Sequence, residues 1–598
     1  MHTKLKRFFL LVLAVALLAA TGTAVRPLSE MRTRYELTNE PVTGVSPQLA
    51  LATQVFGWAR GIIIDVIWIR MEALKRECRY YEMVQLADWA CKLAPRIPTV
   101  WDIQSWNMAY NVTVYIDKYE ERWPWVKTGM ELLRDQAIPA NPNSIVLYQR
   151  LAWLIFHKIG QEDDNAHMFY KEAFARLMHE ALGGSGDRDT LQSFIDAPET
   201  VEELRQDEDV AYIIDTCNRL GFDIVSGFFL WYHDVKAVPE QVNDLLGRPD
   251  NVAPLKRIAA YVRAKKLREE LRLEPERMLK LVDAYGPFDW RGPYAHAVYW
   301  AVVGLERLAE AQGRLDAMVD EYGLPEPRGR AEFDYLFDDS EGIYEWERIN
   351  LERVIYGSLQ SLVRQGRMLF NDKGLWLKEW GPDYRFADAV VVLFDRAWKT
   401  WLPRYRKGIR SGYVTFLGGG VAEFYFMGDN DKSREYYDML KEEFPEHVGK
   451  MSYDDYLQAR IMRYTVDLTF EDTAMTFSEV RRLVRGLYSR AFLNLAYGEE
   501  DVAAKLEKQA ESLANGFAPE RAERLLRERV RADEIRRSVL VDLLTGQVRA
   551  SPVAIANLKA KLGPETVKSI LESVEGTDRG LPETEEVPDE LKTKPSLQ

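Results

Sequence analysis

Cysteine is scarce in this chain of 598 residues, and basic residues are outnumbered by acidic ones. Its three cysteines, Cys78, Cys91 and Cys217, form no CxxC pair, which argues against a disulfide framework and a cysteine-based zinc site. We expect buried free thiols, with a Cys78–Cys91 disulfide as the alternative outside the cytoplasm. Lysine and arginine number 79 against 93 aspartates and glutamates, giving a net charge of −14. This acidic excess argues against a nucleic-acid partner.

Catalytic motifs are missing as well. The sequence has no GxSxG nucleophile motif, no HExxH metal motif, and no GxGxxG or GK[ST] phosphate loop. The glycine run Gly418–Gly420 stands inside a stretch with helical periodicity, where glycine permits a close helix–helix approach or a kink. We therefore expect a non-enzymatic protein without a cofactor or a resident metal.

The first residues have the pattern of a membrane-targeting segment. Lys4, Lys6 and Arg7 precede a run from Phe8 to Val25 that contains no charged residue. A basic flank before an apolar run predicts that the start stays inside and that the remainder is translocated. We favour a retained anchor over a cleaved signal peptide, whose cleavage would leave a secreted protein. The bulk of the chain is thus expected on the periplasmic side.

Most of the sequence after Pro47 has helical periodicity. Apolar residues recur at intervals of three and four, and the segments end at glycine, proline or asparagine, which predicts an all-α protein. Several segments also share a spacing of four and then three residues: Met83, Ala87 and Ala90; Ala166, Tyr170 and Ala173; Ser433, Tyr437 and Leu440; Ala503, Glu507 and Ala510. Pro95 and Pro445 follow two of these sets and are expected to end the helices. Small residues at such positions let a neighbouring helix approach closely.

This spacing resembles that of tetratricopeptide repeats (TPRs), which are helix-turn-helix pairs of 34 residues. Three segments carry the resemblance: Leu417, Val421, Phe424, Gly428, Ser433, Tyr437, Leu440 and Pro445; Tyr148, Leu151, Ala152, Ile155, Ala166, Tyr170 and Ala173; Ile67, Met71, Leu74, Met83, Ala87, Ala90 and Pro95. The resemblance implies a TPR-like α-solenoid with irregular helical insertions. Under it, "RYYEMVQLADWACKLAPRIPTVW" (79–101) is the packing seam of stacked helices rather than a reaction centre.

The predicted organisation has six parts. They are a signal-anchor or transmembrane segment (1–25), a linker (26–60), TPR-like repeats (61–180), an irregular helical region (181–350), a second TPR-like region (351–545), and a short helix with a disordered acidic tail (546–598).

The resemblance also implies a concave groove lined by first-helix residues. In this chain those positions are Trp68, Glu72, Asp102, Trp106, Tyr110, Gln149, Trp153, Phe156 and His157. Tryptophans with a few polar groups suit a groove that anchors a peptide. The alternative is that flanking helices fill the groove and make these residues core. The leading hypothesis is a membrane-anchored scaffold that binds or organises other proteins of a bacterial-type envelope.

Two other functions remain open. Abundant tryptophan and tyrosine are compatible with a carbohydrate-binding envelope protein. A metal-dependent hydrolase would use His157, Asp163 and His167, but Asp163 and Asp164 also stand where the following helix needs an N-terminal carboxylate. A second polar set, Asp289, Arg291 and His296, is expected to be structural, with Pro293 in the first turn of a helix.

The stretch "GWARGIIIDVIWIRMEALKRE" (57–77) places Arg60 and Asp65 in an otherwise apolar helix. We expect this helix to be buried, with the two charges paired. The alternative is that its isoleucine-rich face lies on the membrane surface beside the anchor.

Overall fold

The computed structural model describes residues 27, 30–31, 60–77, 79–322, 345–370, 377–381, 383–401, 403–426, 429–466, 477–515, 531–545 and 552–575. The predicted membrane segment (1–25), Cys78 and the acidic tail beyond residue 575 lie outside these residues. None of the described helices is both long enough and apolar enough to cross a bilayer.

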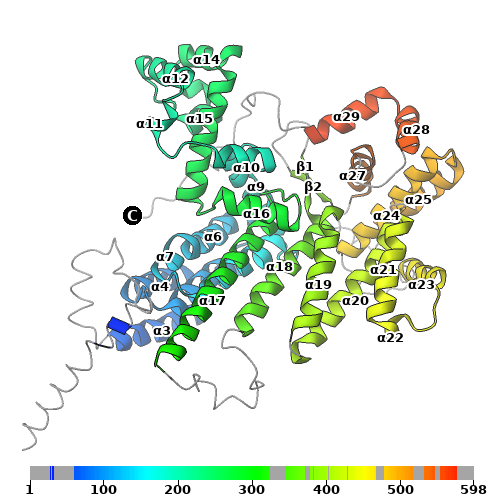
Figure 1. Ribbon diagram of the computed structural model, residues 1–598, viewed down its shortest axis with the longest axis horizontal. Coiled ribbons are helices and arrows are strands. Elements are labelled where there is room, and N and C mark those ends of the chain that lie inside the picture. Colours follow the sequence, from blue (N-terminus) through cyan, green and yellow to red (C-terminus); the bar gives the residue numbers. More distant parts are fainter. Residues whose placement is uncertain are drawn as a thin grey trace, which may run out of the picture. The chain divides into compact units, whose positions relative to one another are not determined.

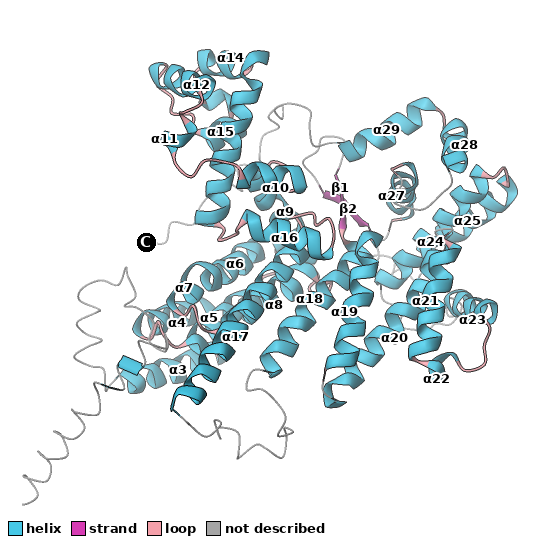
Figure 2. Cartoon of the chain, in the orientation of Figure 1, coloured by secondary structure: helices cyan, strands magenta, loops and turns pink. Residues whose placement is uncertain are grey.

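The all-α expectation is confirmed: nearly every described element is a helix (Figure 2). The exception is an antiparallel hairpin of β1 (Arg367–Phe370) and β2 (Leu377–Gly381), which the periodicity did not predict. Arg367 pairs with Gly381 and Met368 with Trp380, and the register shifts between Leu369 and Phe370.

The chain divides into two compact units, one of Met1–Leu154 with Trp300–Glu352 and one of Ile155–Tyr299 with Arg353–Gln598. The elements of the first unit are α3 (Arg60–Arg76), α4 (Tyr80–Leu93), α5 (Pro98–Trp106), the π-helix η1 (Asn107–Val112), the 3₁₀-helix η2 (Thr113–Tyr115), α6 (Tyr119–Glu131), the π-helix η3 (Leu132–Ala137), α7 (Ile138–Ala140), α8 (Ile145–Trp153), most of α17 (Pro293–Tyr322) and the start of α18 (Glu345–Gln365).

Close helix packing forms the core of the first unit. Met83, Ala87 and Ala90, the residues of the four-and-three spacing, are each only 1% exposed on α4. α4 packs on both α3 and α5, and the Trp101 indole donates a 2.8 Å hydrogen bond to the Pro95 carbonyl just after α4 ends. Small residues on this face therefore allow the close approach that the spacing predicted.

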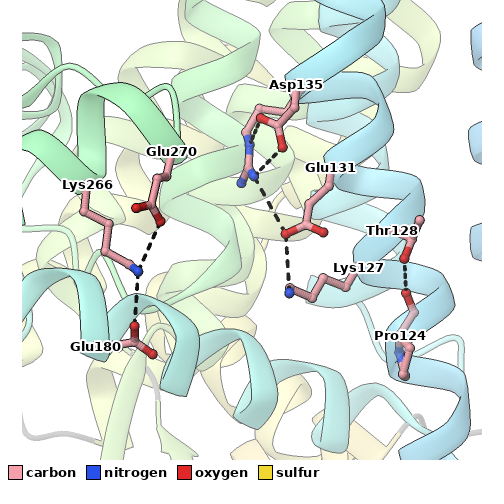
Figure 3. Close-up of polar contacts among 9 residues, drawn as sticks. Pro124, Lys127, Thr128, Glu131, Asp135, Glu180, Lys266 and Glu270 are labelled. Atoms are coloured by element: carbon pink, nitrogen blue, oxygen red, sulfur yellow. Dashed lines mark hydrogen bonds and ion pairs between the residues drawn. The ribbon is translucent and has the colours of Figure 1, made fainter. Parts of the chain in front are cut away.

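Charged side chains of α6 and η3 form a series of ion pairs along the helix (Figure 3). Glu131 lies 3.5 Å from the Lys127 ammonium and 3.8 Å from the Arg134 guanidinium, which also pairs with Asp135 at 2.7 Å. On the same helix the Thr128 hydroxyl donates a 2.7 Å hydrogen bond to the Pro124 carbonyl. Pairs one turn apart add only a few tenths of a kcal/mol each to helix stability, about 0.2–0.5 kcal/mol.

The second unit contains most of the chain (Figure 1). Its elements are the π-helix η4 (Leu154–Gly160, from Ile155), α9 (His167–Leu182), α10 (Arg188–Ile195), α11 (Val201–Leu204), α12 (Glu208–Arg219), α13 (Phe228–His233), η5 (Val235–Ala237), α14 (Glu240–Leu246), η6 (Pro249–Asn251), α15 (Val252–Lys265), the π-helix η7 (Lys266–Glu270), α16 (Pro275–Tyr285), the start of α17, the remainder of α18, β1, β2, η9 (Tyr384–Phe386), α19 (Ala387–Thr400), α20 (Pro403–Phe426), α21 (Asn430–Glu443), α22 (Pro445–Val448), α23 (Tyr453–Val466), α24 (Phe477–Ala496), α25 (Glu500–Asn515), α27 (Ala532–Leu544), α28 (Pro552–Leu562) and α29 (Pro564–Glu575).

Helices α11 to α15 gather in Figure 1 around a hydrophobic cluster of their own, which includes Ile213, Cys217 and Ile258. Arg263 on α15 places its guanidinium 4.8 Å from the centre of the Tyr232 ring and 5.4 Å from that of Phe228. From the adjoining η7, Lys266 pairs with Glu180 of α9 at 3.1 Å (Figure 3). These contacts tie the cluster to α9 within the second unit.

The α20–α21 pair confirms the structural interpretation of the glycine run. Gly418–Gly420 lies within α20, and a Cβ atom on Gly420 would stand 2.4 Å from the Tyr436 ring of α21. The Ser433 hydroxyl donates a 2.6 Å hydrogen bond to the Val421 carbonyl, and Ser433 is fully buried. The glycine and the serine thus let the two helices approach closely, and Pro445 follows just after α21 ends.

Two burial predictions are wrong in part. In the aromatic stretch 79–101, Tyr80 and Trp101 are buried, but Tyr81 and Trp89 are 68% and 62% exposed. The isoleucine-rich helix α3 is buried on one face only, and Asp65 is exposed. The physical reason is the same in both places: each helix carries apolar residues on two faces, and the residues that point away from its contacts with described neighbours stay exposed.

The cysteine prediction is confirmed where the structure describes it, because Cys91 and Cys217 are buried and free. Burial raises the pKa of the Cys91 thiol to about 12 and that of Cys217 to about 11, so neither is a ready nucleophile.

Candidate functional site

The predicted groove residues come together most clearly at the end of α5. This helix starts with Pro98 in its first turn and ends at Trp106, where the chain continues as the π-helix η1. Residues four apart on a helix lie on the same face, one turn above one another. Trp106 and Tyr110 accordingly stack with their ring centroids 4.0 Å apart and their planes 15° apart.

An arginine from α8 completes this arrangement. The Arg150 guanidinium lies 5.5 Å from the centroid of the Trp106 ring, within the range of a cation–π interaction. The same guanidinium donates a 2.9 Å hydrogen bond to the Asp102 carboxylate one turn before Trp106. We call Asp102, Trp106, Tyr110 and Arg150 the Trp106 cluster. Its tryptophan remains 37% exposed, so the cluster presents an ordered aromatic surface to solvent.

Other exposed aromatic rings stand on the adjoining elements of the first unit. Tyr115 of η2 stacks on Tyr80 of α4 with centroids 4.4 Å apart, and Tyr81 meets the edge of Trp125 at 5.3 Å. Tyr115 is 62% exposed and Tyr81 68% exposed. The π-helix η1, which carries Tyr110, contacts both α4 and α6. The exposed rings on these helices therefore stand on elements that adjoin the Trp106 cluster.

The remaining groove residues of the first unit are distributed over two helices. Gln149 and Trp153 lie on α8 beside Arg150 and are half-buried. Trp68 is half-buried and Glu72 is exposed on α3. Within the described part of the chain, neither Trp68 nor Glu72 stacks on or pairs with a member of the Trp106 cluster.

Phe156 and His157 belong to the second unit, on η4. The Phe156 ring faces Tyr294 at a centroid distance of 6.2 Å and lies against Gly357, whose Cβ would stand 3.1 Å from it. Phe156 therefore has a packing role. The His157 Nε2 lies 3.5 Å from the Asp163 carboxylate, and burial lowers the pKa of this histidine despite that neighbour.

The proposed hydrolase residues do not form a metal centre. His167 is buried and its Nδ1 lies 3.1 Å from the Lys171 ammonium, an arrangement that opposes a cation. Asp164 pairs with Lys158 at 2.5 Å and accepts a 2.9 Å hydrogen bond from the Ala166 amide. The carboxylate thus orders the turn before α9, although the N-cap residue is Ala166 rather than an aspartate. Among the described residues, no three His, Cys, Asp or Glu side chains are grouped to hold a metal ion.

Lys171 belongs to a buried polar network that connects α9, α17 and α18 within the second unit. Its ammonium lies 3.3 Å from the Gln365 amide oxygen, and the Gln365 amide nitrogen donates a 2.7 Å hydrogen bond to the Tyr294 hydroxyl. That hydroxyl in turn donates to the Gly160 carbonyl. Burial raises the pKa of Tyr294, while burial and then Lys171 hold the pKa of His167 well below its usual value. Because both groups stay neutral and paired, the network fixes the helices in place.

The second polar set is also structural, as predicted. Arg291 forms a two-pronged pair with Asp289, with nitrogen–oxygen distances of 2.9 and 2.7 Å. The His296 Nε2 lies 2.7 Å from the Trp290 carbonyl, and α17 begins at Pro293. These contacts close the turn that leads into α17.

The second unit contains an open groove that was not among the predicted sites. It has a volume of about 670 Å³ and is lined by Tyr425 of α20, Asn430 and Arg434 of α21, and Tyr453, Asp454, Leu457 and Gln458 of α23. The Arg434 guanidinium lies 4.2 Å from the centre of the Tyr453 ring. We call this the Tyr453 groove. Aromatic faces beside amide and charged groups give it both apolar and hydrogen-bonding walls.

No protein-family model, curated protein or solved structure matches this chain significantly.

Sequence reasoning missed Arg150 and the Tyr453 groove for different reasons. Arg150 follows the predicted Gln149, but its partner Asp102 lies 48 positions earlier, and nothing local indicates the pair. Part of the Tyr453 groove lies within the repeat-like segment 417–445, but the register was not continued to the next helix, which carries Tyr453 and Leu457.

Proposed function

We propose that this protein is a membrane-anchored, extracytoplasmic scaffold that binds other proteins of the cell envelope. The observation that carries the proposal is the Trp106 cluster, a solvent-facing stack of tryptophan and tyrosine held by an arginine–aspartate pair. The anchor is supported by the basic flank and the uncharged run Phe8–Val25.

A TPR-like solenoid is the architecture that we propose for this scaffold. It is supported by helix pairs such as α3–α4, with Ala87 and Ala90 buried, and α20–α21, where Gly420 and Ser433 allow a close approach. Stacked pairs of this kind present successive first helices along one surface, which is how such proteins bind extended partners.

The chemistry of the cluster fits a protein–protein contact. Tryptophan, tyrosine and arginine dominate the residues whose truncation weakens interfaces most. The stack and the Asp102–Arg150 pair hold these side chains in place before a partner arrives, so less conformational entropy is lost on binding. Because Arg150 already has a carboxylate partner, the surface favours an aromatic or aliphatic side chain over Trp106 rather than a free anion.

The direct test is capture of envelope proteins by the purified full chain. We expect Trp106→Ala to reduce the amount of captured partner at least tenfold. Removing such an anchor weakens the binding free energy by about 2 kcal/mol or more. Trp346→Ala is the matched control, since Trp346 is 46% exposed and stands outside the cluster. Equal capture by the wild type and Trp106→Ala would contradict the proposal.

Carbohydrate binding is the second candidate, and the Tyr453 groove is the observation that favours it. Tyr425 and Tyr453 supply aromatic faces for sugar rings, and Asn430, Gln458 and Asp454 supply hydrogen-bonding groups for hydroxyls. Glycan binding that is lost on Tyr453→Ala and kept on Trp106→Ala would support this function. Absence of any glycan binding by the wild type would dismiss it.

A further inference from the structure

Helix α3 is apolar on two opposite faces. Ile64, Ile67, Met71 and Leu74 are buried on the face that packs in the first unit. The opposite face presents Ile62, Val66 and Ile69, which are 60%, 61% and 72% exposed. These three residues are spaced four and three apart, so their side chains form one continuous strip along the helix.

Such a strip is unusual for a helix that faces water. A surface helix of a globular protein has one apolar stripe and a polar opposite face, whereas a helix that is apolar all round has apolar surroundings on both sides. Single exposed apolar side chains need no explanation, but a contiguous strip of branched aliphatic residues indicates a contact surface. We call Ile62, Val66 and Ile69 the outer strip of α3.

The position of α3 in the chain indicates what the strip contacts. Among the described helices, α3 is the first long one after the uncharged run Phe8–Val25, and residues 26–59 separate the two in the sequence. At full extension these 34 residues span at most about 120 Å, which limits how far α3 can lie from an anchored segment. An anchor at Phe8–Val25 therefore holds α3 close to the lipid surface and raises its effective concentration there.

The residues around the strip suit an interface between lipid and water. Exposed charges of both signs flank it, among them Asp65, Arg70 and Glu72. This mixture gives no net attraction to a strongly anionic surface, so the apolar side chains must supply the affinity. Exposed Arg76 and Lys75 lie in the last turn of the helix, where long basic side chains reach headgroup phosphates.

We infer that α3 lies flat on the membrane, with Ile62, Val66 and Ile69 inserted at the boundary between headgroups and acyl chains. The inference rests on the proposed anchoring of the chain, and it adds a second membrane contact that orients the first unit on the bilayer. Because the contact is apolar, it persists at high salt.

The test uses the full chain reconstituted in phosphatidylcholine vesicles, with an environment-sensitive fluorophore on Val66→Cys. Val392→Cys on α19 is the control, because Val392 is also an exposed valine, at 64%. Both variants carry Cys78→Ser, and Cys91 and Cys217 are buried thiols that react slowly. We expect the label at position 66 to shift to shorter wavelength and to be quenched by spin-labelled lipid, at low and at high salt. The label at position 392 should show neither effect.

Three outcomes would overturn the inference, and they are distinguishable. A chain that does not float with the vesicles refutes the proposed anchoring and this inference with it. A chain that floats with a fully aqueous label at position 66 refutes the inference alone. A blue shift without quenching by lipid means that protein, such as a second copy of the chain, covers the strip instead.

An independent check uses the triple variant Ile62→Gln, Val66→Gln and Ile69→Gln. Because these side chains point to solvent, the variant should fold as the wild type does, with the same thermal midpoint in detergent. On vesicles, we expect amide hydrogen exchange of α3 to be faster in the variant than in the wild type. Equal exchange of α3 in the two proteins on vesicles would contradict the membrane contact.

Discussion

Single glycines show how closely the helices of this protein approach. A Cβ on Gly420 would meet the buried Tyr436 ring at 2.4 Å, whereas a Cβ on Gly408 of the same helix would meet nothing within 4 Å. We therefore predict that Gly420→Ala destabilises the protein by about 1–3 kcal/mol through overpacking. Gly408→Ala should stabilise it by up to about 1 kcal/mol, since alanine is the better helix former. Urea denaturation measures both, and equal effects of the two changes would contradict this packing.

A single hydroxyl group links three elements of the second unit. The Tyr294 hydroxyl accepts a hydrogen bond from Gln365 and donates one to the Gly160 carbonyl. Tyr294→Phe would leave both of these buried groups without that partner, at a cost of about 1–3 kcal/mol. Tyr497→Phe is the control, because Tyr497 is 64% exposed and should tolerate the change. Thermal denaturation compares the two, and an unchanged midpoint for Tyr294→Phe would show that the network contributes nothing to stability.

At the scale of elements, α9 makes stability depend on pH. Burial, and then Arg291 and Arg263, lower the pKa of His179 from 6.5 to about 4, and His167 is lowered in the same direction. Between pH 6.5 and about pH 4, His179 binds a proton in the unfolded chain but not in the folded protein. The free energy of unfolding therefore falls as the pH falls. The contribution of neutral His179 to stability is fully present above pH 6.5 and is lost as the pH falls towards 4. The free energy of unfolding falls by about 1–3 kcal/mol over this range.

Denaturation curves from pH 7.5 to 4.5 test this dependence. We expect His179→Gln to lose less stability over that range than the wild type, because it has no group to protonate at that position. Parallel curves for the two proteins would contradict the assignment.

The elements also show where sequence reasoning stops. Periodicity predicted the helices and their closing prolines, but it assumed 3.6 residues per turn throughout. The π-helices η1 and η4 break that period at Asn107 and Leu154. Trp106 and Tyr110, which the spacing placed in one groove, do stack, whereas Phe156 and His157 belong to the second unit, a division that local spacing does not indicate. The extra residue in a π turn leaves no mark on hydrophobic spacing, so the π-helices themselves were not predictable.

At the scale of the molecule, composition and spacing were enough for the all-α fold, because amphipathic helices need only local sequence. The β1–β2 hairpin was missed, although the turn-forming residues Asn371, Asp372 and Gly374 stand between its strands. The sequence offered an exposed, membrane-facing side of α3 only as the alternative to burial, because a helix with two apolar faces has the same composition as a buried one. Pairings across long separations, such as Asp102 with Arg150, depend on the tertiary fold.

The central claim, that the Trp106 cluster is a docking surface for another envelope protein, is tested most directly by photo-crosslinking in cells. A photoreactive phenylalanine replaces Val146, which is 42% exposed and lies one turn before Arg150 on α8. A control chain carries it at Val553, which is 69% exposed in the second unit. We predict a defined protein adduct at position 146 that disappears when Trp106→Ala is added, and no such adduct at position 553. An absent adduct at position 146, or one that persists in the Trp106→Ala background, would contradict the claim.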